Sequence, residues 1–151
     1  MTYTSNANGL SAEITERLIE TAKTYRRHSY APYSHYNVGA AVLDDKGNIT
    51  GGCNIENAAY SPGICAERNA VYKAVSEWTD HGRIIAVAIA GSPEGDKITQ
   101  YAFPCGVCRQ VIREFADPDE CMVIVAGPGN DREERTLNEL LPDSFGPDNL
   151  A

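Results

Sequence analysis

The sequence predicts an α/β protein in which helices cover both faces of a mixed central sheet, a three-layer α/β/α sandwich. Segments with helical spacing of apolar residues alternate along the chain with short apolar runs typical of strands. One such run, residues 83–90, is rich in Ile, Val and Ala with no polar alternation, which indicates a strand covered on both faces. This alternation predicts parallel pairing for the later strands, beside an antiparallel hairpin near the N-terminus.

Length and composition restrict the possible partners. The 151 residues suit one domain spanning 1–151, with residues 1–10 as a flexible N-terminus and residues 142–151 as a C-terminal tail. A net charge of −8 disfavours binding to nucleic acid, which draws on clustered Lys and Arg. The sequence contains neither a secretion signal nor the run of about 20 apolar residues that a membrane span needs. We therefore expect a soluble, cytoplasmic protein without nucleic-acid or membrane partners.

The N-terminal part of the chain predicts a helix followed by a β-hairpin. Ser11 can cap a helix that continues to about Ser29 and stops before Pro32. Two strand-like runs, 38–43 and 49–54, flank the sequence Asp-Asp-Lys-Gly, which is a turn signal. These runs are therefore expected to pair as antiparallel strands.

The remaining elements alternate between helices and strands. A helix is expected to begin at Cys65, and the strand at 83–90 that follows it should be central in the sheet. After a polar loop, another helix begins at Cys105, because apolar residues recur at helical spacing from there. Residues 122–126 predict a further strand, and residues 136–141 predict a short helix before the C-terminal tail.

Three of the five cysteines lie in two short motifs, Cys65-Ala66-Glu67 and Pro104-Cys105-Gly106-Val107-Cys108. Zinc prefers thiolate and imidazole ligands, and a catalytic zinc keeps three protein ligands so that the fourth position can hold water. Cys105 and Cys108 are three residues apart, which aims both sulfurs the same way on a first helical turn. Helix N-termini also favour thiolate over thiol. We therefore predict a catalytic zinc ion held by Cys65, Cys105 and Cys108.

Glu67 is the candidate proton shuttle of this site. Because it lies two residues from Cys65, its carboxylate can approach a zinc-bound water without coordinating the metal. Burial would raise its pKa and the metal charge would lower it. The alternative is a surface acid in the first turn of a helix, where acidic residues are favoured. Beside the cysteines, we favour the proton shuttle.

Other residues near the motifs have two readings each. Three thiolates on one dication leave a net negative cluster, which Arg68 can offset by hydrogen bonding to a ligand sulfur, and Gln110 can supply a further donor. Alternatively, both are solvated surface residues. Cys53 and Cys121 are expected to be buried apolar groups, although either can serve as the fourth ligand of a closed structural site. The histidines, His28, His35 and His81, lie in neither motif.

The sequence resembles the small cytidine deaminases of pyrimidine salvage, which carry this pair of zinc motifs. The resemblance covers nearly the whole chain. Outside the zinc motifs it rests on Tyr30-Ala31-Pro32-Tyr33-Ser34, Val38-Gly39-Ala40-Ala41, the run from Gly52 to Tyr60, Glu139-Leu140-Leu141-Pro142 and Phe145-Gly146-Pro147. It implies a cytidine deaminase-like fold and a homotetramer with one Zn²⁺ per subunit. The implied reaction is hydrolytic deamination of cytidine and deoxycytidine to uridine and deoxyuridine, with release of ammonia.

The resemblance also implies a set of residues that bind the nucleoside. Asn54 and Glu56 are implied to hold the ribose, chiefly its 3′-hydroxyl. Tyr36 is implied to stack near the base, at a position where family members usually have Phe, so its hydroxyl needs a partner. The implied substrate-binding residues are Asn54, Glu56, Tyr36, Ala66, Tyr60 and Phe145. Phe145 either reaches the pocket of a neighbouring subunit or anchors the tail, and Tyr33 and Tyr60 are candidates for subunit contacts.

Three alternatives remain at this stage. The same machinery can deaminate another aminopyrimidine, although a substrate lacking ribose would not need Asn54 and Glu56. A nucleic-acid-editing deaminase is disfavoured by the acidic composition and by the lack of a basic, aromatic strand-binding stretch. A non-catalytic binding module whose fold is stabilised by zinc would need a fourth protein ligand. The loop 91–103 looks longer than is usual in the family, and the sequence assigns it no role.

Overall fold

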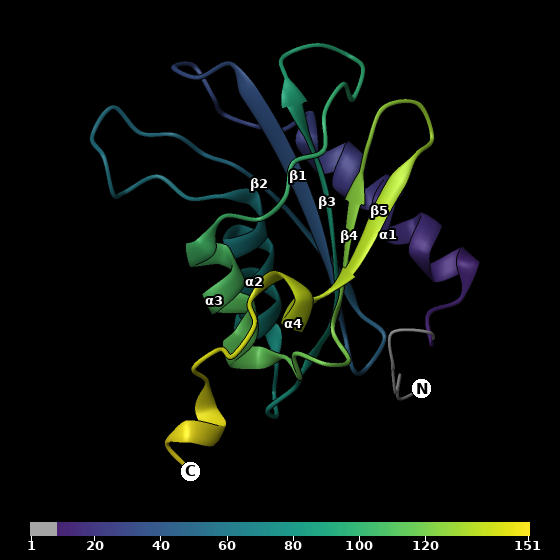
Figure 1. Cartoon of the computed structure of the whole chain (residues 1–151). Helices are drawn as coiled ribbons and strands as arrows, with labels where there is room; N and C mark the ends of the chain where they lie inside the picture. The colour runs from purple at the N-terminus through teal and green to yellow at the C-terminus, as the bar shows by residue number, and fades with distance from the viewer. Residues whose placement is uncertain (1–8) are drawn as a thin grey trace.

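The computed structural model describes residues 9–151, so most of the flexible N-terminus expected for residues 1–10 lies outside the described residues. The elements along the chain are α1 (Ala12–Arg26), β1 (Tyr36–Asp44), β2 (Ile49–Cys53), α2 (Ala66–Glu77), β3 (Ile84–Pro93), α3 (Gly106–Phe115), β4 (Met122–Ala126), β5 (Arg132–Thr136), α4 (Leu137–Leu140) and a 3₁₀ turn at Pro147–Asn149 (Figure 1). Within the described part, no helix combines the length and apolarity needed to cross a membrane.

The five strands form one mixed sheet in the order β2-β1-β3-β4-β5. β1 pairs antiparallel with both β2 and β3, β3 pairs parallel with β4, and β4 pairs antiparallel with β5. The antiparallel hairpin, the central position of β3 and the parallel β3–β4 pair are confirmed. The register of the central pair places Val87 opposite Val123 and Ile89 opposite Val125 in the core on one face. Ala88 and Ile124 lie in the core on the other face, which explains why the paired parts of both strands are apolar.

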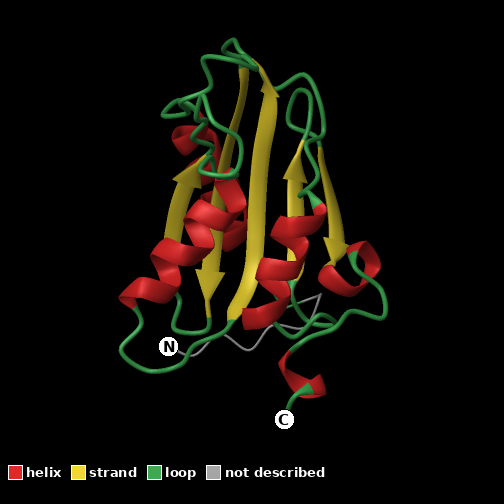
Figure 2. Ribbon diagram, turned by 90° about the vertical axis from the view of Figure 1, so that its left-hand side faces the viewer, coloured by secondary structure: helices red, strands yellow, loops and turns green. Residues whose placement is uncertain are grey.

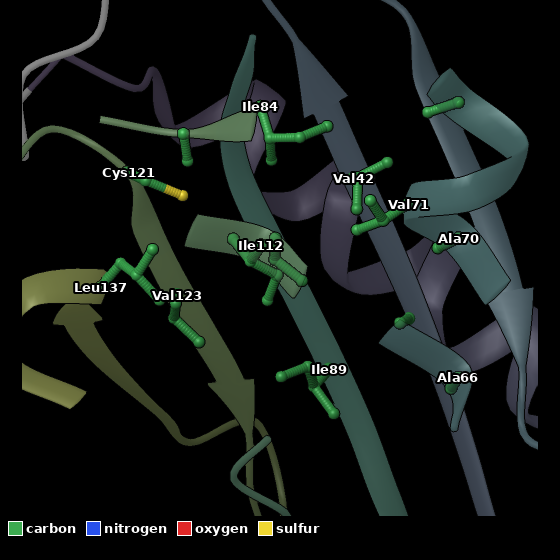
Figure 3. Close-up of a cluster of buried hydrophobic side chains, with 14 of the residues drawn as sticks. Val42, Ala66, Ala70, Val71, Ile84, Ile89, Ile112, Cys121, Val123 and Leu137 are labelled. Atoms are coloured by element: carbon green, nitrogen blue, oxygen red, sulfur yellow. The ribbon is translucent and has the colours of Figure 1, made fainter. Parts of the chain in front are cut away.

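Helices cover both faces of the sheet, which confirms the three-layer α/β/α arrangement (Figures 1 and 2). α1 packs on one face, where Leu18 and Ala22 contact a core that includes Leu43 and Ile124. α2 and α3 lie on the other face, over the cluster shown in Figure 3, to which α2 contributes Val71. β1, β3 and β4 are therefore covered on both sides, and they support the helices whose starts carry the predicted zinc motifs.

Two glycines of the hairpin let the helices approach it closely from opposite faces. A Cβ atom built on Gly39 would lie 1.9 Å from the carbonyl oxygen of Ala22 in α1. A Cβ built on Gly52 would lie 2.6 Å from the backbone nitrogen of Ala70 in α2. Any side chain at either position would force its helix away from the sheet. Gly52 therefore fixes how closely α2, with its zinc motif, packs on β2.

The structure corrects one predicted helix end and adds one strand. α1 begins after its Ser11 cap as predicted but ends at Arg26 rather than Ser29. The chain leaves the helix there because the backbone of Tyr30 pairs with the segment after β2, donating to the Asn54 carbonyl and accepting from the Glu56 amide. The edge strand β5 was not predicted at all. Its sequence, Arg-Glu-Glu-Arg-Thr, lacks apolar alternation, and charged side chains of this kind protect sheet edges from further pairing.

Candidate metal centre and active site

The three predicted zinc ligands come together where two helices begin. Cys65 is the N-cap of α2, Cys105 is the N-cap of α3, and Cys108 lies in the first turn of α3. The sulfur atoms of Cys65 and Cys105 are 3.9 Å apart, and those of Cys105 and Cys108 are 3.5 Å apart. Tetrahedral zinc with bonds of about 2.3 Å places its sulfur ligands roughly 3.8 Å apart. The donor type and the spacing of this cluster therefore fit zinc.

Two of the three sulfurs differ in how readily they ionise. The interaction with Cys108, together with the hydrogen bond and the positive charge of Arg68, lowers the pKa of Cys65 to about 5. The pKa of Cys108 is raised, because of its interaction with Cys65 and because it is buried. Cys65 is thus the first of this pair to ionise, and a dication placed between the sulfurs would favour thiolate at every ligand.

Arg68 lies against the sulfur cluster. Its Nη2 donates a hydrogen bond to the Sγ of Cys65 at 3.3 Å, and this bond raises the pKa of the guanidinium. The cation therefore offsets part of the negative charge that three thiolates would carry. The alternative of a solvated surface arginine does not describe this contact.

Glu67 is buried beside the cluster, with 4% of its surface exposed. Burial, together with a smaller contribution from the nearby charge of Cys65, raises the pKa of its carboxyl to about 7. A nearby metal cation would act in the opposite direction. A carboxyl group whose pKa lies near neutral pH can both accept and return a proton. Because Glu67 is buried, the alternative of a surface acid does not describe this structure.

A cavity of about 380 Å³, here called the reaction cavity, opens beside the sulfurs. Its size lies in the range of small-molecule sites. Of the predicted site residues, those that line it are Tyr36, Asn54, Cys65, Ala66, Glu67 and Cys105. Most of these come from the end of β2 and the start of α2, so the two ends of the loop between these elements place polar and metal-binding groups around one space.

Asn54 and Glu56 follow β2 and are both held by backbone groups. The Asn54 side chain accepts from the Val38 amide at 2.9 Å and donates to the Tyr36 carbonyl at 2.8 Å. The Glu56 carboxylate accepts from the amides of Tyr33 and Ser34 at 3.0 and 3.2 Å. Hydrogen bonding by the Ser34 side chain and by these amides lowers the pKa of Glu56, which keeps it anionic. Both groups are therefore oriented before any ligand binds.

A second cavity of about 650 Å³, here called the loop cavity, adjoins the reaction cavity, since Asn54 and Cys65 line both. Glu56 and Tyr60 line the loop cavity only. The Tyr60 side chain is fully exposed, on the loop that projects from the sheet between β2 and α2 (Figure 1). Within this chain, Tyr60 is therefore not part of the reaction cavity.

Two of the predicted residues, Gln110 and Phe145, contact each other instead of the sulfur cluster. The sequence left two readings for Gln110, a donor toward a ligand sulfur or a solvated amide. The side chain is exposed, and its Nε2 donates to the carbonyl of Phe145 at 3.0 Å rather than to a sulfur. The Phe145 side chain is 59% exposed on a tail that extends away from the sheet in Figure 1. Arg113 holds the same tail by hydrogen bonds to Ser144 and Asp148. The correction has a simple reason: Gln110 and Arg113 are one turn apart on α3 and face the tail together.

The structure places the other cysteines and the histidines away from the cluster. Cys121 is buried in the core under α3, and Cys53 donates to the carbonyl of His28, as expected for buried thiols. Within residues 9–151, the only group of histidine, cysteine or acidic side chains close enough to share a metal is the trio Cys65, Cys105 and Cys108. The described residues therefore offer no fourth sulfur at this site.

Sequence reasoning missed the segment 100–103, which lies in the loop that it left without a role. Tyr101, Ala102 and Phe103 line the reaction cavity directly before the second zinc motif. The hydroxyl of Tyr36, for which the sequence offered no hydrogen-bond partner, donates to the side chain of Gln100 at 3.0 Å. Only the adjacency of Phe103 to Pro104 and Cys105 could have drawn attention to this segment.

Comparison with known proteins gives an independent assignment. The sequence model described as "Cytidine and deoxycytidylate deaminase zinc-binding region" matches residues 12–125. The chain is 43% identical over 136 residues to the cytidine deaminase of Sporosarcina psychrophila, covering 90% of this chain and 94% of that protein. It is 40% identical over 135 residues to the cytidine deaminase of Halalkalibacterium halodurans, covering 89% and 96% respectively.

Solved structures agree with the sequence comparisons. The crystal structure of cytidine deaminase from Burkholderia pseudomallei superposes with a TM-score of 0.77 at 36% identity, covering 90% of this chain and all of that chain. That from Mycobacterium tuberculosis gives a TM-score of 0.70 at 35% identity, covering 87% and 97% respectively. Together with the sulfur cluster and the buried carboxyl group, these matches show that the chain belongs to the cytidine and deoxycytidylate deaminase family.

Proposed function

We propose that this protein catalyses the hydrolytic deamination of cytidine and deoxycytidine to uridine and deoxyuridine, releasing ammonia, as a step of pyrimidine salvage. The observation that carries the proposal is the position of Glu67, a buried carboxyl group in the same cavity as two sulfurs of the metal cluster. Cys65, Cys105 and Cys108 would hold one zinc ion per subunit. When bound, zinc supplies a water molecule activated for attack at neutral pH.

Glu67 performs the proton transfers in this proposal. Its carboxylate accepts a proton from the attacking water and delivers it to ring N3, while the water oxygen bonds to C4 of the cytosine ring. The second proton of the oxygen then passes through Glu67 to the amino group. The C4–N4 bond breaks and ammonia leaves, which restores a carbonyl at C4. Water and cytidine are consumed, and no other reactant is needed.

The residues at the end of β2 are assigned to the sugar. Asn54 lines both cavities and Glu56 lines the loop cavity, so an amide lies where the two cavities adjoin and a carboxylate lies in the second of them. An amide and an anionic carboxylate can bind hydroxyl groups together, with the carboxylate as a strong acceptor. Tyr36 and Ala66 would contact the base beside Glu67. A substrate without ribose would leave the Glu56 acceptor unused, which favours nucleosides over free bases.

The direct test is loss of cytidine absorbance on addition of purified protein, measured together with zinc content. We expect turnover of cytidine and deoxycytidine, weak or no turnover of free cytosine, and one zinc per chain. Metal-free protein, or a metal coordinated by four protein ligands without turnover, would overturn the proposal. Faster turnover of free cytosine than of cytidine would overturn the assignment of Asn54 and Glu56 to the sugar.

We also propose a homotetramer located in the cytoplasm. Tyr33, Tyr60, Val107 and Phe145 are all more than half exposed, an arrangement that burial against other subunits would relieve. In such an assembly, Tyr60 and Phe145 would reach neighbouring reaction cavities, which this chain leaves without them. A reducing compartment keeps the five free thiols available. Light scattering after gel filtration and cell fractionation test the two statements separately.

A further inference from the structure

The segment 100–103, here called the wall segment, forms one side of the reaction cavity. It lies in the connection between β3 and α3, which loops out past the end of β3 and returns to the start of α3 (Figure 1). Tyr101, Ala102 and Phe103 line the cavity, and Pro104 and Cys105 follow at once. The position of this segment therefore affects both the shape of the cavity and the approach to a metal ligand.

One side of the wall segment is anchored to the β4–β5 hairpin. The hydroxyl of Tyr101 hydrogen bonds to the carboxylate of Asp131 in the turn of that hairpin. The Tyr101 ring occupies the space beside Gly127, where an added Cβ would come within 2.1 Å of the ring. The Phe103 ring faces the guanidinium of Arg135 in β5 at 6.0 Å. Hydrogen bonding, ring packing and a cation–π contact thus fix this side.

On its other side, the wall segment packs through Ala102 against Gly91 of β3, and a side-chain hydrogen bond joins it to β1. The Tyr36 hydroxyl donates to the Gln100 Oε1 atom at 3.0 Å. Tyr36 begins β1 and lines the reaction cavity, whereas Gln100 is exposed. Burial raises the pKa of the Tyr36 phenol, so at neutral pH it remains a protonated donor. The bond links two cavity walls that are 64 residues apart in the sequence.

We propose that Gln100 is a positioning residue that acts through Tyr36, holding the Tyr36 ring and the wall segment at a fixed separation for the nucleoside. The Tyr36 hydroxyl is then used by Gln100 rather than by substrate, and the ring presents its apolar surface to the cavity. This inference rests on the proposed function. Preorganised walls lower the ordering cost of binding, so the bond should act mainly on KM.

A double-mutant cycle tests the proposal. Tyr36→Phe removes only the hydroxyl, and Gln100→Leu removes only the acceptor. Each should raise the KM for cytidine by about two- to tenfold, the range of one neutral hydrogen bond, with a smaller change in kcat. The double variant should be no worse than either single variant, because both remove the same bond. Gln100→Glu keeps an acceptor and should restore KM, while Thr99→Val, an exposed neighbour, should behave as wild type.

A second measurement reports the bond without turnover. Lys97 is exposed in the same loop, so tryptic cleavage after Lys97 in the zinc-loaded protein, followed by mass spectrometry, measures opening of the loop. Tyr36→Phe and Gln100→Leu should accelerate this cleavage to a similar extent, and Gln100→Glu should not.

The outcomes separate the two proposals. If Tyr36→Phe raises KM and Gln100→Leu does not, the hydroxyl contacts substrate and the positioning role is wrong. Additive KM effects, or equal cleavage rates in every variant, would also overturn it. A wild-type protein that binds zinc but leaves cytidine unchanged would refute the proposed function instead, and the cleavage rates would still decide whether the bond holds the loop.

Discussion

The Arg68 guanidinium donates a hydrogen bond to the Cys65 sulfur at 3.3 Å, three residues along the first turn of α2. Between them lies Glu67, whose buried carboxyl group faces the reaction cavity. In the proposed mechanism, one helical turn therefore supplies a sulfur ligand, a proton carrier and a cation that offsets thiolate charge. Helical geometry brings residues three apart to the same side, so the group stays together as long as α2 begins at Cys65.

Replacing Arg68 should weaken the metal centre. In Arg68→Gln the charge opposite Cys65 is lost, and changes in groups that support metal ligands typically cost about 10- to 100-fold in metal affinity or activity. Zinc affinity from competition with a chromophoric chelator measures the effect. Arg27→Gln, at the exposed end of α1, is the matched control and should leave affinity unchanged. Equal affinities for Arg68→Gln and wild type would contradict this role.

Replacing Glu67 should separate chemistry from structure. Glu67→Gln keeps size and polarity but cannot carry the proton, so kcat should fall by at least the roughly 10²- to 10⁴-fold typical of general acid–base catalysis. Zinc content and circular dichroism should match wild type. Glu13→Gln, also in the first turn of a helix, serves as the control. Near-normal turnover by Glu67→Gln would remove this residue from the mechanism.

Removing zinc should abolish activity and also lower stability. The metal would join the starts of α2 and α3, and a ligand that binds only the folded state at 1,000 times its Kd stabilises that state by about 4 kcal/mol. Chelation should therefore lower the melting temperature, and added zinc should restore both melting temperature and turnover. Unchanged melting after verified metal loss would mean that the ion does not connect the two helices.

Arg26 provides a prediction away from the metal. Its side chain is 5% exposed and donates to the carbonyls of Asn37, Ser92, Pro93 and Gly95 and to the Ser92 hydroxyl. Arg26→Met would leave several of these acceptors without a partner, so the free energy of unfolding should fall by about 3 kcal/mol. Urea denaturation checks this value, with the exposed Arg27→Met as control.

Glu56 should contribute stability that depends on pH. Hydrogen bonds to its carboxylate lower its folded-state pKa, so the contribution is fully present above the unfolded pKa and is lost as pH falls through the folded pKa. The melting temperature of wild type should therefore exceed that of Glu56→Gln by a constant amount at neutral pH. This difference should shrink below about pH 4, near the ordinary range of a glutamate. A difference that grows on acidification would have the wrong sign.

Local signals explain what could be predicted from the sequence. The position of the zinc motifs at helix starts could be predicted because apolar residues at helical spacing follow Cys65 and Cys105. Such spacing can be recognised within one or two helical turns. The apolar run of β3 indicated a covered, central strand for the same reason. The charged strand β5 carries no such signal, since its pairing with β4 depends on backbone hydrogen bonds rather than on buried side chains.

Contacts between distant segments could not be read from the chain. Gln110 lies two residues after a sulfur ligand, yet its hydrogen bond goes to Phe145, because the path of the tail places a carbonyl within its reach. Tyr36 and Gln100 likewise meet only through the pairing of β1 with β3. The sequence by itself determined the donor types, their helical spacing and the alternation of elements, because these depend on neighbours along the chain. Only the tertiary structure decided which walls enclose the cavity and which side chains pair across it, because those contacts depend on packing between segments far apart in sequence.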